Sequence, residues 1–598
     1  MVYPPARPRR RILPYLLAVV LAIALIAGLR WFFSGDAENG AESKPSACSG
    51  ESTKIRVASS QDKIGILREV AKEYSGRAVA GRCADVVIDE ANSGTAMRAL
   101  AKGWNEQSDG ARPDVWSPAA SAWVTLLRQQ ASNADGTVPV ADGKPVPIVT
   151  APLVFAMPKP MAEALGWPGK AIGWSELAEL AADPKGWAKY DHPEWGQFKL
   201  GKTNPNFSTS GLNATIGAYF AATGTTSDLT ARDVADAKTR SFVGGVEQSI
   251  VHYGDISMTF LGNLLRADDR GESMAYISAI TVEENSVTDY NRGNPSGDPA
   301  TLGRHAPPRT PLVAVNPKEG TLFSDHPYVP LTWMDAAKKA VADDFLTYLH
   351  SPPVQAKFQS YGYRSFDGKP GPQAVEKNGV DPGAKITTLS PPTPAVLDKV
   401  LASWSELRKR ANVLIVVDKS GSMEEEASGT GESRLELAKK AAVNALPQFR
   451  GDDKVGLWAF STRQDGAKDY LELVPVDSVS KTGPKLRAQL EGLTAGGGTG
   501  LYDTTLAAVE RMRGAKDAGA INAVVFLTDG KNEKTGGSDL DNLLGKLNPD
   551  VRLFTIGYGE GADQGVLRQI AEATDGAAYD SSRADTIDQV FTSVISNF

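Results

Sequence analysis

The chain has 598 residues, of which 41% are hydrophobic and 23% are charged, and its formal net charge is −7. This length is too great for one hydrophobic core, so two or three domains of ordinary globular composition are expected. The mild charge and the absence of a basic stripe give no reason to expect nucleic-acid binding.

The N-terminus has the pattern of a membrane anchor. Four arginines (Arg7, Arg9, Arg10 and Arg11) precede an uncharged run from Ile12 to Leu29, and Trp31, Phe32 and Phe33 follow it. This predicts a cytoplasmic basic tail over 1–11 and a transmembrane helix over 12–33. The bulk of the chain is then expected outside the cell membrane as a single-pass protein. A cleaved signal peptide is the alternative, and it also exports the bulk.

Residues 34–50 are rich in Gly, Ser, Ala and Glu and are expected to form a linker. The chain has two cysteines, Cys48 and Cys83. An oxidising compartment permits a disulfide bond between them, which would tie the linker to the first domain, and two free thiols are the alternative.

From residue 51 to 375, short strands alternate with helices. The expected strands include 54–58, 85–88 and 113–116, and the first expected helices are 64–74 and 96–103. Each strand leads through a Ser, Thr or Gly loop into a helix N-terminus, where free N–H groups favour an anion or hydrogen-bonding oxygens. Helix capping is the plainer explanation of any one such loop. The candidate ligand-binding residues are Ser59, Ser60, Ser93, Gly94, Thr95, Ser117, Thr209, Ser210 and Tyr290.

This region resembles the extracytoplasmic solute-binding proteins, with a type II periplasmic-binding-protein-like fold. The resemblance rests on the order of several segments: 206–212 at the start of a helix, 274–277 as a strand, 283–291 as a crossover, 320–327 as the return to the first lobe, and 336–349 as the last helix. The resemblance implies two lobes around a cleft that binds a small molecule. Trp116, Tyr276 and Tyr290 could line the cleft, but a place in the core is the favoured interpretation for each of them.

Residues 376–410, which include the Pro-rich stretch 390–394, are expected to be a linker with a connecting helix. The apolar run 412–417 then predicts a buried strand that ends at Asp418, with Ser420 and Ser422 close behind. Two later segments offer similar groups, namely Thr499 on a glycine loop and Asp529 at the end of the apolar strand 524–528. Such oxygen ligands suit a hard divalent cation.

Residues 411–598 resemble the von Willebrand factor type A (VWA) domain, a Rossmann-like fold with a doubly wound, mostly parallel sheet. The resemblance places its metal-ion-dependent adhesion site on Asp418, Ser420, Ser422, Thr499 and Asp529. It implies Mg²⁺, or Mn²⁺ or Ca²⁺, with a vacancy for the carboxylate of a protein partner. The acidic run 424–426 is expected to be solvated, and it would repel acidic partners if it overhung the metal.

The expected fold class is therefore α/β, and the expected function is that of a binding protein for a small ligand and a protein partner. Delivery of a solute to an ABC-type transporter, with the VWA domain as a scaffold, is the alternative. No catalytic acid–base pair, nucleophile motif or phosphate loop supports an enzyme. The stretch 557–561 only partly matches a dinucleotide fingerprint, because its third glycine is misplaced.

Overall fold

The computed structural model describes residues 48–598 except 135–136, 428, 467, 535 and 584–585. The predicted basic tail, the anchor over 12–33 and most of the linker lie outside these residues. Within the described residues, no helix combines the length and apolar character that crossing a membrane requires. Both cysteines, Cys48 and Cys83, are disulfide-bonded.

The first lobe is built on a six-stranded sheet with the order β2-β3-β1-β4-β11-β5. Its strands are β1 (Ser52–Ser59), β2 (Ala78–Val79), β3 (Arg82–Glu90), β4 (Val115–Ser117), β5 (Val146–Pro147) and β11 (Pro327–Pro330). Its helices are α2 (Ile64–Tyr74), α3 (Ser93–Lys102), α4 (Glu106–Asp109), α5 (Ser121–Ala134), α14 (Ala336–Leu349) and α15 (Pro352–Ser360). Strands β1, β3 and β4 run parallel, so the loops after them meet at one edge of the sheet.

The second lobe is built around the long strand β6 (Val149–Pro158), every residue of which is buried. The other strands are β7 (Leu200–Gly201), β8 (Ala279–Glu283), β9 (Leu312–Val315), β10 (Phe323–Ser324) and β12 (Arg364–Ser365). The helices are α6 (Lys159–Ala164), α7 (Trp174–Ala182), α8 (Thr209–Thr223), α9 (Ala231–Ala235), α10 (Ala237–Gln248), α11 (Ser257–Asp269), α12 (Ser273–Tyr276) and α13 (Glu284–Asn291). The expected strand at 274–277 is wrong, because α12 covers most of it and the strand begins at Ala279.

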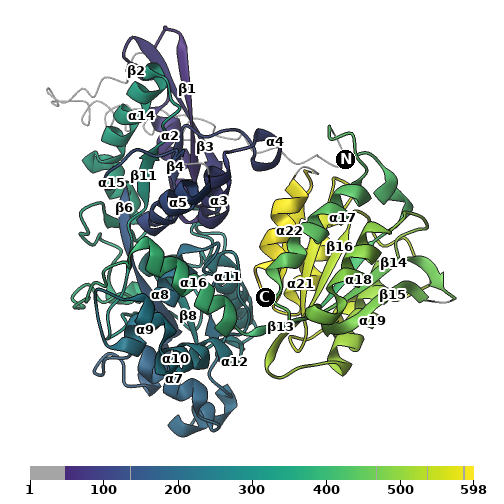
Figure 1. Ribbon diagram of the computed structural model, residues 1–598. Helices are drawn as coiled ribbons and strands as arrows, with labels where there is room; N and C mark the ends of the chain where they lie inside the picture. Colours follow the sequence, from purple (N-terminus) through teal and green to yellow (C-terminus); the bar gives the residue numbers. More distant parts are fainter. Residues whose placement is uncertain (1–47, 135–136, 428, 467, 535, 584–585) are drawn as a thin grey trace, which may run out of the picture. The chain divides into compact units, whose positions relative to one another are not determined.

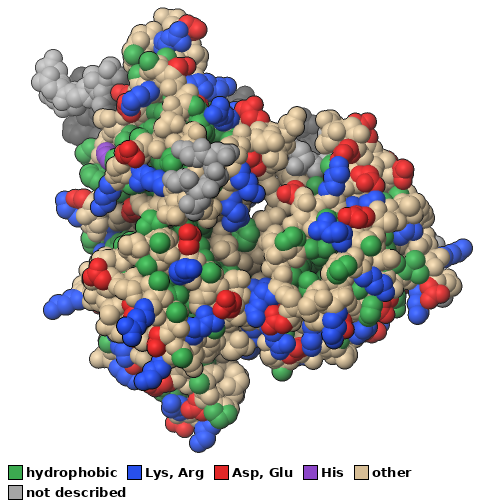
Figure 2. All heavy atoms as spheres, viewed as in Figure 1, with side chains coloured by type: hydrophobic (Ala, Val, Ile, Leu, Met, Phe, Trp, Pro, Cys, Tyr) green, Lys and Arg blue, Asp and Glu red, His purple; other side chains and the backbone are tan. Residues whose placement is uncertain are grey.

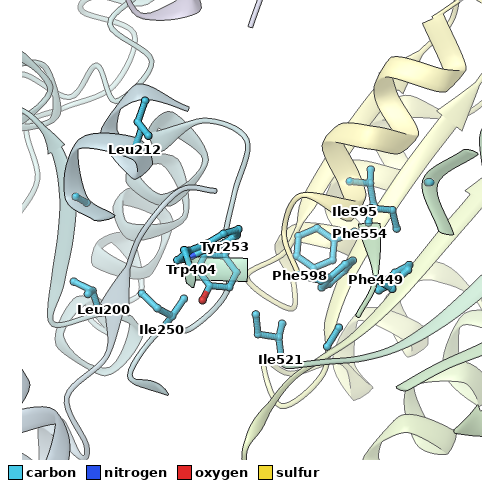
Figure 3. Close-up of a cluster of buried hydrophobic side chains, with 14 of the residues drawn as sticks. Leu200, Leu212, Ile250, Tyr253, Trp404, Phe449, Ile521, Phe554, Ile595 and Phe598 are labelled. Atoms are coloured by element: carbon cyan, nitrogen blue, oxygen red, sulfur yellow. The ribbon is translucent and has the colours of Figure 1, made fainter. Parts of the chain in front are cut away.

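The segment 376–410, expected to be a Pro-rich linker with a connecting helix, contains a helix and packs on the second lobe. Leu389 is buried, and α16 (Pro394–Leu407) lies against α8, α9 and α10 of the second lobe. Trp404 of α16 packs edge-on against Tyr253, with ring centroids 5.3 Å apart (Figure 3). Because its apolar face is buried, α16 is part of the core of the second lobe.

The C-terminal domain has one sheet with the order β15-β14-β13-β16-β17-β18, visible in green and yellow in Figure 1. The strands are β13 (Arg410–Asp418), β14 (Lys454–Asp465), β15 (Lys468–Ser478), β16 (Ala520–Thr528), β17 (Arg552–Tyr558) and β18 (Ala577–Ser581). The helices are α17 (Arg434–Ala445), α18 (Val479–Glu491), α19 (Leu501–Gly514), α20 (Leu540–Lys546), α21 (Gln564–Glu572) and α22 (Ile587–Ile595). All strand pairs are parallel except β14 with β15.

Helices cover both faces of this C-terminal sheet. Side chains of α17, α18 and α22 pack on one face, and those of α19, α20 and α21 pack on the other. Phe598 closes one end of the core, where its ring meets Phe554 and Phe449 (Figure 3). Since β13 and β16 are central and buried on both faces, the residues that follow them are held at the carboxyl edge of the sheet.

Short 3₁₀ turns complete the structure: η1 (Gln61–Lys63), η2 (Gly186–Tyr190), η3 (Pro193–Trp195), η4 (Pro299–Thr301), η5 (Glu376–Asn378), η6 (Gly421–Glu424) and η7 (Leu446–Gln448). On the face shown in Figure 2, acidic and basic side chains are interspersed. This mixed surface agrees with the mild net charge of the sequence.

Candidate metal centre and interlobe cleft

The residues that the sequence predicted as metal ligands lie together at the carboxyl edge of the C-terminal sheet. Asp418, Ser420, Thr499 and Asp529 are each no more than 1% exposed, and Ser422 is partly exposed. The Oγ atoms of Ser420 and Ser422 are 3.1 Å apart, and Ser422 donates from Oγ to Oδ1 of Asp529 at 2.7 Å. The structure therefore brings the first and third segments into direct contact.

Thr499 reaches the same place from the glycine loop before α19. Its Oγ1 lies beside Gly530, because a Cβ added to that glycine would stand 2.8 Å from the oxygen. Glu533 holds the loop, since its Oε2 accepts from the Thr499 amide at 3.0 Å and its own amide donates to the Thr499 carbonyl at 2.9 Å. All three predicted segments thus converge.

Asp418 is the most deeply buried carboxylate of the group. Its Oδ1 accepts from the Ser420 amide at 2.7 Å, and its Oδ2 accepts from Thr528 Oγ1 at 2.5 Å. Burial raises the pKa of Asp418 to about 7, although these hydrogen bonds oppose the shift. A buried carboxylate with a raised pKa is one that a cation would stabilise in its ionised form.

Two carboxylates and three hydroxyls make a hard-oxygen donor set that fits a divalent cation such as Mg²⁺. Asp418, Ser420, Ser422, Thr499 and Asp529 would hold the ion, which would supply a Lewis-acidic position for an outside carboxylate. Sequence reasoning missed Thr528 and Glu533, which orient Asp418 and Thr499. It also missed Arg434, which donates from Nη1 to Oδ2 of Asp529 at 2.8 Å. No motif marks Arg434, because it lies 95 residues away in the chain.

The acidic run after Met423 is exposed, as expected. One member, Glu425, is an ion-pair partner of Arg434, with 3.0 Å between its Oε2 and Arg434 Nη2. The negative charge of Glu425 is therefore paired with Arg434, which lies beside the candidate metal ligands.

The interlobe cleft holds a cavity of about 40 Å³ lined by both lobes. Of the predicted ligand-binding residues, it is lined by Ser60, Ser93, Thr209 and Ser210. Ser60 and Ser93 follow β1 and β3 of the first lobe, and Thr209 and Ser210 begin α8 of the second. The expected convergence of these hydroxyl loops is thus found for four positions.

The other five predicted residues are not in this cavity. Ser59 and Ser117 are fully buried behind it, Gly94 contacts the opposite lobe, and Thr95 lines a different hollow. The prediction that Tyr290 binds the ligand is wrong, because its side chain is 0% exposed in the core of the second lobe. Trp116 and Tyr276 are buried in cores as well.

The expected ligand was an anion or a group with hydrogen-bonding oxygens, and the lining of the cavity does not favour the anion. The N–H groups at the start of α3 are already used, since Asn92 Oδ1 accepts from the Gly94 and Thr95 amides at 3.1 and 3.2 Å. The cavity is lined instead by the carboxylates of Asp62, Asp255 and Glu283. The hydroxyl-bearing loops predicted this cleft from the sequence. No local sequence pattern predicted that these three acidic residues would line it.

The two lobes are in contact around the cavity. The Gly94 amide donates to the Phe207 carbonyl at 3.1 Å, and Arg98 donates from Nη1 to the Asn206 carbonyl at 2.8 Å. Trp123 donates from Nε1 to Thr209 Oγ1 at 2.8 Å. The structure is therefore that of a closed cleft.

Comparison with known proteins agrees with this architecture. A family profile described as bacterial extracellular solute-binding protein matches residues 55–364, and one described as von Willebrand factor type A domain matches residues 412–593. Two uncharacterized proteins of Mycobacterium tuberculosis, from strains CDC 1551 / Oshkosh and ATCC 25618 / H37Rv, are each 24% identical over 592 residues. These alignments cover 94% of this chain and 79% of each relative.

Two solved structures are similar to separate parts of the chain. A periplasmic thiamin binding protein is 14% identical with a TM-score of 0.38, covering 63% of this chain and 100% of its own. A von Willebrand factor type A protein from Catenulispora acidiphila is 23% identical with a TM-score of 0.27, covering 31% of this chain and 42% of its own. With its two lobes and the profile match over them, this chain belongs to the bacterial extracellular solute-binding protein family and carries a von Willebrand factor type A domain at its C-terminal end.

Proposed function

We propose that this chain is a membrane-anchored extracytoplasmic binding protein rather than an enzyme. It binds a small solute between its two lobes, and it binds a protein partner through a divalent cation on the VWA domain. The family membership and the closed cleft support solute capture. The arginine-flanked apolar run at the N-terminus supports the anchor and the export of the bulk.

The observation that carries the partner-binding part is the convergence of three chain segments on one oxygen cluster. Ser422 Oγ lies 3.1 Å from Ser420 Oγ and 2.7 Å from Asp529 Oδ1, and Thr499 adjoins Gly530. Ser422 and the neighbouring Gly421 remain partly or fully exposed. A cation held here would therefore be open to a carboxylate from outside.

The test is the response of the full chain to Mg²⁺ after treatment with a chelator. A ligand that binds the native state stabilises it by mass action, by about 2.7 kcal/mol at a concentration of 100 times Kd. We expect Mg²⁺ to raise the unfolding temperature of the wild type and to leave that of Asp418→Ala unchanged. Asp541→Ala is the matched control, because Asp541 is an exposed aspartate of the same domain.

Partner binding is then tested by recovering cross-linked proteins in Mg²⁺ and in chelator. We expect a partner that is retained by the wild type and by Asp541→Ala only when Mg²⁺ is present. Equal Mg²⁺ stabilisation of Asp418→Ala and the wild type would refute the assignment of the metal centre.

A further inference from the structure

The interlobe cavity is small and lined with oxygen atoms. At about 40 Å³ it has room for a few water-sized groups, whereas pockets for organic ligands usually measure about 300 Å³ or more. Its polar lining consists of hydroxyls, amides and the carboxylates of Asp62, Asp255 and Glu283. Among the described residues, no Lys, Arg or His side chain lines it. A cavity of this size and charge suits a cation.

Directly behind this lining, a histidine joins two of the carboxylates. Nδ1 of His326 lies 3.2 Å from Oδ2 of Asp62, and Nε2 lies 3.1 Å from Oε2 of Glu283. One ligand atom from each of the three residues falls within 4.8 Å of the others. Asp62 comes from the first lobe, Glu283 ends β8 of the second, and His326 lies on the segment that returns between them.

His326 is fixed in a strained position and is incompletely satisfied. Its side chain is 0% exposed, yet Nδ1 has no hydrogen bond of acceptable geometry within the described part of the chain. Its backbone has φ of 34°, a region that side-chain-bearing residues rarely adopt. Backbone bonds from its amide to the Ala119 carbonyl and from the Ile148 amide to its own carbonyl, both 3.0 Å, hold it there. Such strain, together with an unsatisfied buried nitrogen, is typical of a functional position.

Lys63 interacts electrostatically with Asp62 and Glu283, but the hydrogen bonds of its ammonium go to other groups. The buried ammonium of Lys63 donates to Ser60 Oγ at 2.5 Å and to the Ser117 carbonyl at 3.0 Å, which are neutral acceptors. Arg364 pairs with Glu284 rather than Glu283. Glu283 is buried and Asp62 is partly exposed, and a buried carboxylate needs a partner or a metal ion. Among the described residues, the ion-pair partner of Asp62 and of Glu283 is therefore the imidazole of His326, and no Lys or Arg side chain pairs with either carboxylate.

We propose that Asp62, Glu283 and His326 hold a divalent first-row transition-metal ion between the lobes, and that this ion is the solute of the cleft. This rests on the proposed solute-binding function and gives it a ligand class. One imidazole and two carboxylates form a mixed donor set that suits Mn²⁺, Fe²⁺ or Zn²⁺ better than Mg²⁺. Because the ligands come from both lobes, the ion stabilises the closed form.

The experiment uses the metal-stripped full chain carrying Asp418→Ala, which removes the VWA site. Zn²⁺ and Mn²⁺ are titrated alone by calorimetry, and Co²⁺ is added to record its visible spectrum. We expect one equivalent of metal to bind and the Co²⁺ spectrum to show a nitrogen ligand. Adding His326→Gln should weaken binding about 100-fold or more, since even changes around first-contact ligands cost 10- to 100-fold. His192→Gln, at an exposed histidine, is the control.

Two results would overturn the proposal: no transition metal bound by the Asp418→Ala chain, or equal binding after His326→Gln. In the first case, His326 serves as an imidazolium bridge only. If His326→Gln does not fold, the near-isosteric Asp62→Asn and Glu283→Gln replace it, with the same expected loss. Stabilisation of the same chain by an organic solute, without metal binding, would support the proposed solute-binding function. It would refute only the proposal that the solute is a metal ion.

Discussion

Arg434 donates from Nη1 to Oδ2 of Asp529 at 2.8 Å, which places a guanidinium against one of the candidate metal ligands of the VWA domain. The same nitrogen reaches the Ser422 carbonyl at 3.3 Å, and Nη2 pairs with Glu425 at 3.0 Å. Arg434 thus links the metal-ligand cluster to the acidic run outside it. A divalent cation bound by Asp529 would be repelled by the guanidinium of Arg434 at short range.

We expect Arg434→Gln to raise the affinity of the VWA domain for Mg²⁺ by about tenfold, equivalent to about 1.4 kcal/mol. The reason is that a fixed positive charge beside the ion is removed and an Asp529 oxygen is released. Calorimetric titration of Mg²⁺ at constant ionic strength measures the change. Arg511→Gln is the control, because Arg511 is a partly exposed arginine of the same domain that pairs with Glu472. A weaker affinity in Arg434→Gln would mean that Arg434 chiefly orients Asp529.

Closure of the lobes depends on the absence of a side chain at Gly94. A Cβ added there would stand 2.1 Å from the Asn206 carbonyl oxygen and 2.8 Å from the Phe207 Cα. Because both are backbone atoms, neither can move aside cheaply. We expect Gly94→Ala to hold the lobes apart.

The measurement is hydrogen exchange of the segment 204–210, which should lose protection in Gly94→Ala because its backbone contacts with the first lobe are lost. Gly245→Ala is the control, since a Cβ at this exposed helical glycine meets nothing within 4 Å. Unchanged protection would show that the closed contact tolerates the extra methyl group. Mg²⁺ binding to the VWA domain should be the same in both variants.

The sequence predicted that the candidate metal residues of the VWA domain would converge, and the reason is local. Asp418 ends a long buried strand and Asp529 follows another, so both lie at the carboxyl edge of the sheet. The residues that line the cleft were harder to predict from the sequence. The hydroxyl loops of the cleft were visible, but Asp62, Glu283 and His326 are far apart in sequence and meet only through the crossing of the two lobes. Tyr290 illustrates the opposite error, because an aromatic residue near a crossover is equally suited to a core.

Asp289 gives the protein a dependence of stability on pH. Asp289 is buried on α13, and its Oδ1 has no hydrogen-bond partner among the residues that the structure describes. Burial raises its pKa to about 8, although Arg292 opposes the shift. The native state therefore keeps the proton to higher pH than the unfolded chain, where an aspartate has a pKa of about 3.9. The stabilisation from this group is complete below about pH 4 and is lost as pH rises to about 8.

We expect Asp289→Asn to remove this component, which amounts to at most about 1.4 kcal/mol per pH unit. Urea unfolding at several pH values between 5 and 8 measures it, as the difference in slope between variant and wild type. Asp343→Asn, at an exposed aspartate that pairs with Lys339, should keep the wild-type slope. Parallel curves for Asp289→Asn and the wild type would show that Asp289 is ionised in the native state throughout.

Glu247 is the centre of the contacts that hold α16 on the second lobe. Its Oε1 accepts from Lys202 Nζ at 2.5 Å, and its Oε2 accepts from Tyr253 Oη at 2.6 Å and Trp404 Nε1 at 3.1 Å. Lys202 and Glu247 are both 1% exposed in their side chains. Burial lowers the pKa of Lys202, while its pairing with Glu247 opposes that shift.

We expect Glu247→Gln to destabilise the second lobe by about 3–5 kcal/mol, because it leaves the Lys202 ammonium buried without its counter-charge. The midpoint of urea unfolding, followed by tryptophan fluorescence, measures the loss. Glu406→Gln is the control, since Glu406 is exposed on α16 and its pairing with Arg240 of α10 should contribute about 1 kcal/mol or less. The double variant Lys202→Met/Glu247→Leu should recover much of the stability, because replacing both charges with apolar groups leaves none unpaired. Equal losses in the single and double variants would mean that hydrogen bonds to Tyr253 and Trp404, and not the charge pair, hold α16 in place.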